Sequence, residues 1–133
     1  QLFNGDEFRC LDYVEAGYDG LMFGGAVAVA PHMRRMVELF RAGKLEEARA
    51  VDEQMKAELY GIYGGPTIEC WLTGLKYYLV HRGTFTTAAS YFGYPLTAEC
   101  RTFIDRLAAD YTRRGETVTS GERESGSIHG RRH

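Results

Sequence analysis

The chain has 133 residues, of which 44% are hydrophobic and 26% are charged, which suits one globular domain with a modest core. The formal net charge of −2 gives no reason to expect nucleic acid or an anionic membrane as a partner. The longest apolar run, residues 20–31, is too short and too rich in glycine to span a bilayer, and no signal peptide is visible.

The first elements along the chain form a strand–helix–strand pattern. Residues 1–5, QLFNG, predict a short buried strand that ends at Gly5. Asp6 is predicted to be the N-cap of a helix that ends at Gly17, since the apolar residues of EFRCLDYVEAG recur at roughly helical spacing. The stretch DGLMFGG, residues 19–25, predicts a second short strand. Such a βαβ unit has parallel strands.

The rest of the chain is predicted to be helical up to a polar tail. Apolar residues recur at helical spacing in each of four segments, and glycine or proline breaks separate them. Residues from 116 on lack periodicity and predict a disordered tail. The four predicted helices cover residues 30–42, residues 44–64, residues 67–82 and the segment that Thr97 caps.

Two strands alone cannot make a stable open parallel sheet, because such sheets are covered on both faces and contain more strands. The sequence also opens on a strand, without an initiator Met. We therefore expect further residues upstream, so that the chain is the end of a longer protein.

Cysteine and histidine spacing gives no evidence of a cofactor. The cysteines Cys10, Cys70 and Cys100 are scattered and odd in number, which fits a reducing cytoplasm better than a disulfide framework. The histidines have no metal-ligand spacing. Neither a metal nor any other cofactor is expected. The four histidines are His32, His81, His129 and His133.

Several motifs in order resemble a known family. The run LFNGDEFRCLDYVEAGYDGLMFGGA, then a helix, then LFRAGKLEEARAVDEQM, resembles the C-terminal part of the dihydrodipicolinate synthase / N-acetylneuraminate lyase family. The family pattern there is a strand ending in Gly-Asp-Asp or Gly-Asp-Glu, a helix ending in Ala-Gly, and a second strand. The resemblance covers residues 2–114 and rests on the order and spacing of these motifs together.

The resemblance implies an α/β fold, a (β/α)8 barrel with an added C-terminal three-helix segment. Residues 1–43 would be the end of the barrel, with its seventh and eighth strands and their helices. Residues 44–115 would be the C-terminal helical segment, and residues 116–133 the tail. The family also implies a homo-oligomer, a tetramer or a dimer, that includes the remainder of the barrel.

The chemistry that the resemblance implies is that of a class I aldolase. A lysine on the sixth strand forms a Schiff base with pyruvate or another 2-keto acid, and a tyrosine on the fifth strand relays protons. Both residues would precede this chain. Its own lysines, Lys44, Lys56 and Lys76, are predicted on amphipathic helices, so no catalytic residue is assigned here.

The residues that the resemblance places at the substrate follow the two predicted strands. Backbone groups near two of them would hold the carboxylate end of the keto acid, and the other four would face its variable part. For each there is a simpler interpretation as a helix start, a tight turn or a core residue. The backbone pair is Gly5 and Met22, and the other four are Asp6, Glu7, Phe23 and Gly24.

One position departs from the family pattern. Many members have Asn just after the eighth strand, where this chain has Val27 or, with one insertion, Ala28. A member that acts on a sugar acid or another 2-keto acid is therefore at least as compatible with the sequence as a dihydrodipicolinate synthase. The reaction is left open among aldol cleavage, condensation and dehydration of a 2-keto acid. The alternative function, from a different class, is a self-standing helical interaction module without catalytic activity.

Overall fold

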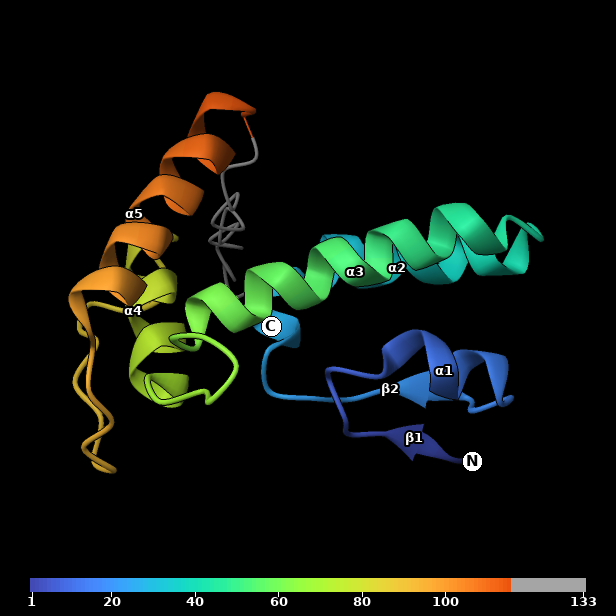
Figure 1. Ribbon diagram of the computed structural model, residues 1–133, viewed down its shortest axis with the longest axis horizontal. Coiled ribbons are helices and arrows are strands. Elements are labelled where there is room, and N and C mark those ends of the chain that lie inside the picture. The colour runs from blue at the N-terminus through green and yellow to red at the C-terminus, as the bar shows by residue number, and fades with distance from the viewer. Residues whose placement is uncertain (116–133) are drawn as a thin grey trace, which may run out of the picture.

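The computed structural model describes residues 1–115, so the predicted tail at residues 116–133 lies outside the described part. Within that part the chain is mostly helical, with two short strands near the N-terminus (Figure 1). None of the helices in residues 1–115 combines the length and the apolarity needed to cross a membrane. The elements are β1 (Phe3–Asn4), α1 (Cys10–Glu15), β2 (Gly20–Leu21), α2 (Ala26–Arg41), α3 (Leu45–Ile62), α4 (Trp71–His81) and α5 (Ala98–Arg113).

The two strands pair in parallel, as the βαβ pattern predicts. Phe3 lies opposite Gly20, and Asn4 lies opposite Leu21. The Met22 amide extends the pairing by donating to the Asn4 carbonyl at 2.8 Å. Both strands are shorter than expected, but the order and direction of the unit are confirmed.

The strand pair is covered on one face and bare on the other. Asn4 is 4% exposed and Leu21 packs against the core, whereas Phe3 is 52% and Met22 is 71% exposed. The first strand is therefore only half buried, and the prediction of a buried strand is wrong for residues 1–115. Met22 is exposed here, but its predicted place in the core of a complete barrel concerns residues beyond those described and stays a prediction. The physical reason is that the helices pack on the Asn4 side, and no described residue covers the face with Phe3 and Met22.

The helix that follows β1 begins later than predicted. Its first residue is Cys10, and Arg9 occupies the N-cap without a capping side-chain hydrogen bond. The prediction of Asp6 as N-cap is wrong, because the Asp6 carboxylate accepts from the Phe8 amide at 3.0 Å and closes a turn before the helix. The predicted end at Gly17 is confirmed, and this residue has a positive φ of 84°.

The next two helices, α2 and α3, form an antiparallel hairpin whose members lie side by side (Figure 1). α2 begins at Ala26 rather than at Ala30, and its backbone is kinked at Val29, two residues before Pro31. The predicted turn at Gly43 is confirmed, with φ 75°. The predicted boundary between barrel end and helical segment falls in this turn. The buried side chains of α3 are Ala48, Asp52, Met55, Leu59 and Ile62.

The last two helices pack against the C-terminal end of α3. α4 begins at Trp71 and not at Thr67, because Ile68 has a positive φ of 47° and the Cys70 amide donates back to the Tyr63 carbonyl at 2.8 Å. The preceding segment is thus a turn. The predicted cap of α5 is confirmed, since Thr97 Oγ1 accepts from the amide three residues later at 3.2 Å.

Two glycines allow these helices to approach α3 closely. A Cβ atom on Gly74 of α4 would lie far inside van der Waals contact with the Ile62 carbonyl oxygen. A Cβ atom on Gly61 of α3 would clash with the ring of Phe103 on α5. The helix packing therefore requires the absence of a side chain at Gly74, whereas at Gly61 the Phe103 ring would have to move.

We expect Gly74→Ala to lower the free energy of unfolding by about 2 kcal/mol, because the Ile62 backbone cannot move away as a flexible side chain could. The better helix propensity of alanine offsets only part of this loss. The measurement is urea-induced unfolding followed by circular dichroism. Gly24→Ala is the control, since a Cβ atom there meets nothing within 4 Å. Equal stability of both variants would contradict the close packing at Gly74.

Candidate functional site

The loops that follow β1 and β2 lie next to each other, because the carboxyl ends of parallel strands meet at one edge. A Cβ atom on Gly5 would be 3.8 Å from the Met22 carbonyl oxygen. The two residues predicted to present backbone groups are thus brought together. The Met22 side chain points away from the core and is exposed.

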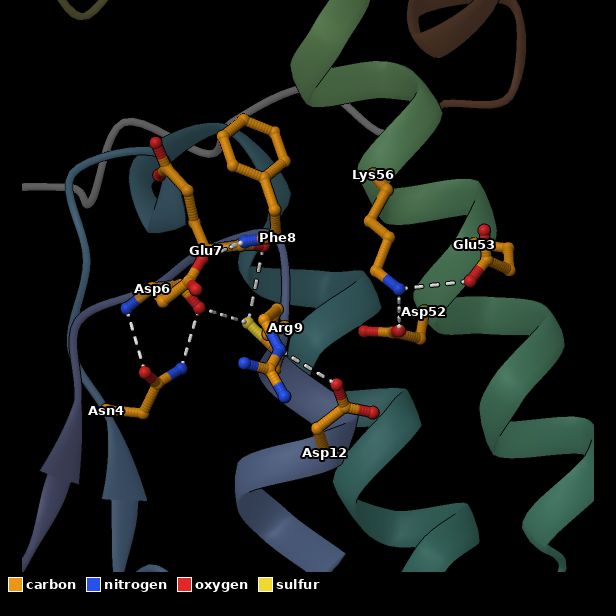
Figure 2. A network of polar contacts seen from close by, with 10 residues as sticks. Asn4, Asp6, Glu7, Phe8, Arg9, Asp12, Asp52, Glu53 and Lys56 are labelled. Carbon is orange, nitrogen blue, oxygen red and sulfur yellow. Dashed lines mark hydrogen bonds and ion pairs between the residues drawn. The ribbon is translucent and has the colours of Figure 1, made fainter. Parts of the chain in front are cut away.

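Asn4 fixes the first loop, and the sequence-based prediction missed it. Its Oδ1 accepts from the Asp6 amide at 2.8 Å, and its Nδ2 donates to the Asp6 carbonyl at 2.7 Å (Figure 2). The Asn4 side chain is 4% exposed, so its end of these part-buried bonds is shielded from water. The sequence did contain a signal for this role, since Asn4 is a polar amide that directly precedes Gly-Asp in an otherwise apolar strand.

The next residue of the loop, Asp6, is exposed, and its carboxylate belongs to the turn described above. Below it lies the Cys10 thiol, which faces the Asp6 and Glu7 carbonyl oxygens at 3.8 and 3.5 Å. Burial, and then the charge of Asp52, raise the pKa of Cys10 to about 12. The thiol is therefore protonated at neutral pH and is not a nucleophile.

Glu7 joins the two loops. Its Oε2 atom accepts from the Gly25 amide at 2.8 Å, across 18 residues of sequence. Gly25 is the N-cap residue of α2, so the carboxylate lies where the free amides and the dipole of that helix favour a negative charge. The neighbouring Phe8 ring stacks on Tyr60 of α3 with centroids 4.3 Å apart. Glu7 thus has a structural role at the predicted site.

The two residues predicted after β2 differ in their surroundings. Phe23 is partly buried and packs against the core. Gly24 is exposed, and a Cβ atom there would meet nothing within 4 Å. Of these two residues, only Gly24 borders open space. The six predicted positions lie in two adjacent loops, but their side chains do not converge on one point.

A buried ion pair on α3 lies beside this region (Figure 2). Lys56 Nζ contacts Asp52 Oδ2 at 2.7 Å and Glu53 Oε1 at 3.0 Å. Asp52 is 3% exposed, and its Oδ1 atom has no hydrogen-bond partner in residues 1–115. Burial opposes the charge on Lys56, but the hydrogen bonds to Asp52 and then Glu53 outweigh it and raise its pKa. The sequence-based prediction expected only apolar residues on the buried face of this helix, so it missed Asp52.

The lysines do not supply a nucleophile at the strand ends. Lys56 is held in the ion pair on α3. Lys44 pairs with Glu47 at 3.1 Å, and Lys76 donates to the Ala89 carbonyl at 2.7 Å. All three amines contact other groups on or beside helices. The groups available for chemistry at the strand ends are therefore backbone groups and carboxylates, with open space at Gly24.

No family model, curated protein or solved structure matches the chain. Over residues 1–115 there is also no group of three or more His, Cys, Asp or Glu side chains that could hold a metal ion.

We expect Lys56→Met to lower the free energy of unfolding by about 3 kcal/mol, because Asp52 would stay buried without its counter-ion. Glu53→Gln is the matched control: it removes the other acid on the same amine, but Glu53 is 67% exposed, so the cost should be below about 0.5 kcal/mol. Urea unfolding at pH 7 measures both.

The pH dependence follows from the same pair. In the folded protein the pKa of Lys56 is raised above its ordinary 10.5. The contribution of the ion pair to the free energy of unfolding is therefore fully present below pH 10.5 and is lost as the pH rises through the raised pKa. Equal costs for Lys56→Met and Glu53→Gln at pH 7 would contradict a buried pair.

Proposed function

We propose that the chain is the C-terminal portion of a Schiff-base-forming lyase of the dihydrodipicolinate synthase type, which acts on pyruvate or a related 2-keto acid. The observation that carries this proposal is the one-sided covering of the parallel strands. The helices pack on the Asn4 and Leu21 side, and Phe3 and Met22 are exposed on the other. A doubly wound sheet has helices on both faces, whereas a (β/α)8 barrel has them only outside.

The outer edge of β2 supports the same proposal. A groove lies between α2 and the segment from the end of α1 to β2. Its lining includes the apolar residues Val14, Leu21, Met33 and Val37 and the charged residues Asp19, Arg34, Glu38 and Arg41. Among residues 1–115, β2 pairs with β1 alone, so its other edge is open to a further strand. In the proposed barrel, that strand would be the first one.

In the complete enzyme, a lysine from an earlier strand would condense with the keto carbon, release water, and give an iminium that accepts electrons from the bond being broken or formed. This chain would supply binding groups. Backbone groups near Gly5 and Met22 would hold the substrate carboxylate. Glu7 would offer its Oε1 atom to a distal hydroxyl, because Gly25 takes Oε2. No cofactor is needed, and we place a homo-oligomeric enzyme in the cytoplasm.

The runner-up is a helical interaction module. The observation that favours it is the aromatic pair Tyr91 and Phe92, 99% and 71% exposed, on the loop between α4 and α5. Aromatic side chains of this kind are enriched at protein interfaces. A module of this kind would form no imine.

We expect the product of the complete reading frame to be trapped by pyruvate and borohydride, and the present chain not to be. Peptide mapping by mass spectrometry should place the reduced adduct on a lysine other than Lys44, Lys56 and Lys76. Their helical positions and their partners motivate this expectation. An adduct on any of the three, or none in the complete protein, would overturn the proposed roles.

Substitution at Gly24 tests the specificity of the site. We expect Gly24→Val in the complete enzyme to lower kcat/KM for a longer hydroxylated substrate by roughly tenfold or more, because the new side chain enters open space at the strand ends. Trapping of pyruvate should stay within about twofold of the parent. Steady-state kinetics and borohydride trapping measure the two effects. Equal losses for both ligands would contradict a role in specificity.

A further inference from the structure

Three side chains from two distant parts of the chain converge on Gly25. A Cβ atom there would lie 2.6 Å from Glu7 Oε2, from Leu59 Cδ2 and from the Tyr63 hydroxyl oxygen. Glu7 belongs to the loop after β1, and Tyr63 is the residue that follows α3. The end of the long helical hairpin therefore reaches the candidate site at the position where only glycine fits.

The Tyr63 hydroxyl faces a group that it can bond. The side chain is fully buried, and its oxygen has no hydrogen-bond partner of regular geometry in the described part of the chain. A buried hydroxyl without a partner is costly. Burial, and then the charge of Glu7, raise the pKa of Tyr63, so the group stays a protonated donor. An ionised carboxylate accepts only, which makes donor and acceptor complementary.

We propose that Tyr63 is a positioning residue whose hydroxyl donates to the Glu7 carboxylate and holds the loop after β1 against the start of α2. Glu7 then has two donors, Tyr63 and the Gly25 amide, one from each side of the site. The helical segment would thereby set the shape of the strand-end loops. An effect of Tyr63 on substrate selection rests on the proposed function, whereas the hydrogen bond between Tyr63 and Glu7 does not.

The chain contains a matched control for this proposal. Tyr60 lies on α3, three residues before Tyr63, and also contacts the loop, but through its ring, which stacks on Phe8 with centroids 4.3 Å apart. Tyr60→Phe keeps that stacking, and Tyr63→Phe removes only the hydroxyl at Glu7. Each variant loses one oxygen atom, so their folds should be equally preserved.

The first test is hydrogen exchange of backbone amides in the chain itself. In Tyr63→Phe, the amides of Phe8 and Gly25 should exchange roughly tenfold faster, as expected for the loss of one hydrogen bond to a charged group. In Tyr60→Phe, the rates at these amides should match those of the parent. Unchanged rates in Tyr63→Phe, or equal increases in both variants, would overturn the proposal.

A second variant separates direct coupling from a general loosening. If Tyr63 acts through Glu7, then Glu7→Gln combined with Tyr63→Phe should exchange no more than about twofold faster at Gly25 than Glu7→Gln alone. If the increases in the Gly25 exchange rate from the two single substitutions multiply in the double variant, the two residues act independently, and the proposal is overturned.

The third readout uses the complete enzyme. Tyr63→Phe should raise KM for a hydroxylated substrate about tenfold, with kcat and pyruvate trapping within about twofold of the parent. A lower kcat at unchanged KM would indicate a merely structural role and count against the proposal. If the parent enzyme traps no pyruvate, the proposed function fails, and the exchange experiments still decide the coupling.

Discussion

The hydrogen bond between the Gly25 amide and the Glu7 carboxylate is the contact on which the N-terminal part of this molecule depends. The two strands are only two residues long each, and so short a parallel pair has little stability of its own. The Glu7 bond joins the end of the first strand to the helix that follows the second. This charged contact at a helix terminus thereby helps to hold the strands on the helical core.

The order of elements could be predicted from the sequence because it depends on local signals. Gly17 and Gly43 end helices through positive φ angles, and Thr97 caps α5 through its own hydroxyl. Asp6 could not be placed correctly, since Asp also closes turns and only the bond to Phe8 decides between the two roles. Spacing gives no information on that choice.

Burial at the candidate site depends on partners that are distant in the sequence. Met22 belongs to an apolar strand, and an apolar pattern cannot tell which face of a sheet the helices will cover. The contributions of Asn4 and Tyr63 were missed for a related reason. Each is polar or amphipathic, and its role follows from contacts that the three-dimensional arrangement creates.

The α2–α3 hairpin also bears on how the molecule folds. Its two helices are joined by a short turn and pack along their length, so the contacts nearest the turn join residues close in sequence. Contacts of this kind close small loops and form quickly, whereas pairing two parallel strands requires a crossover connection. The hairpin is therefore suited to act as the folding nucleus, and the strands would dock on a surface that already exists.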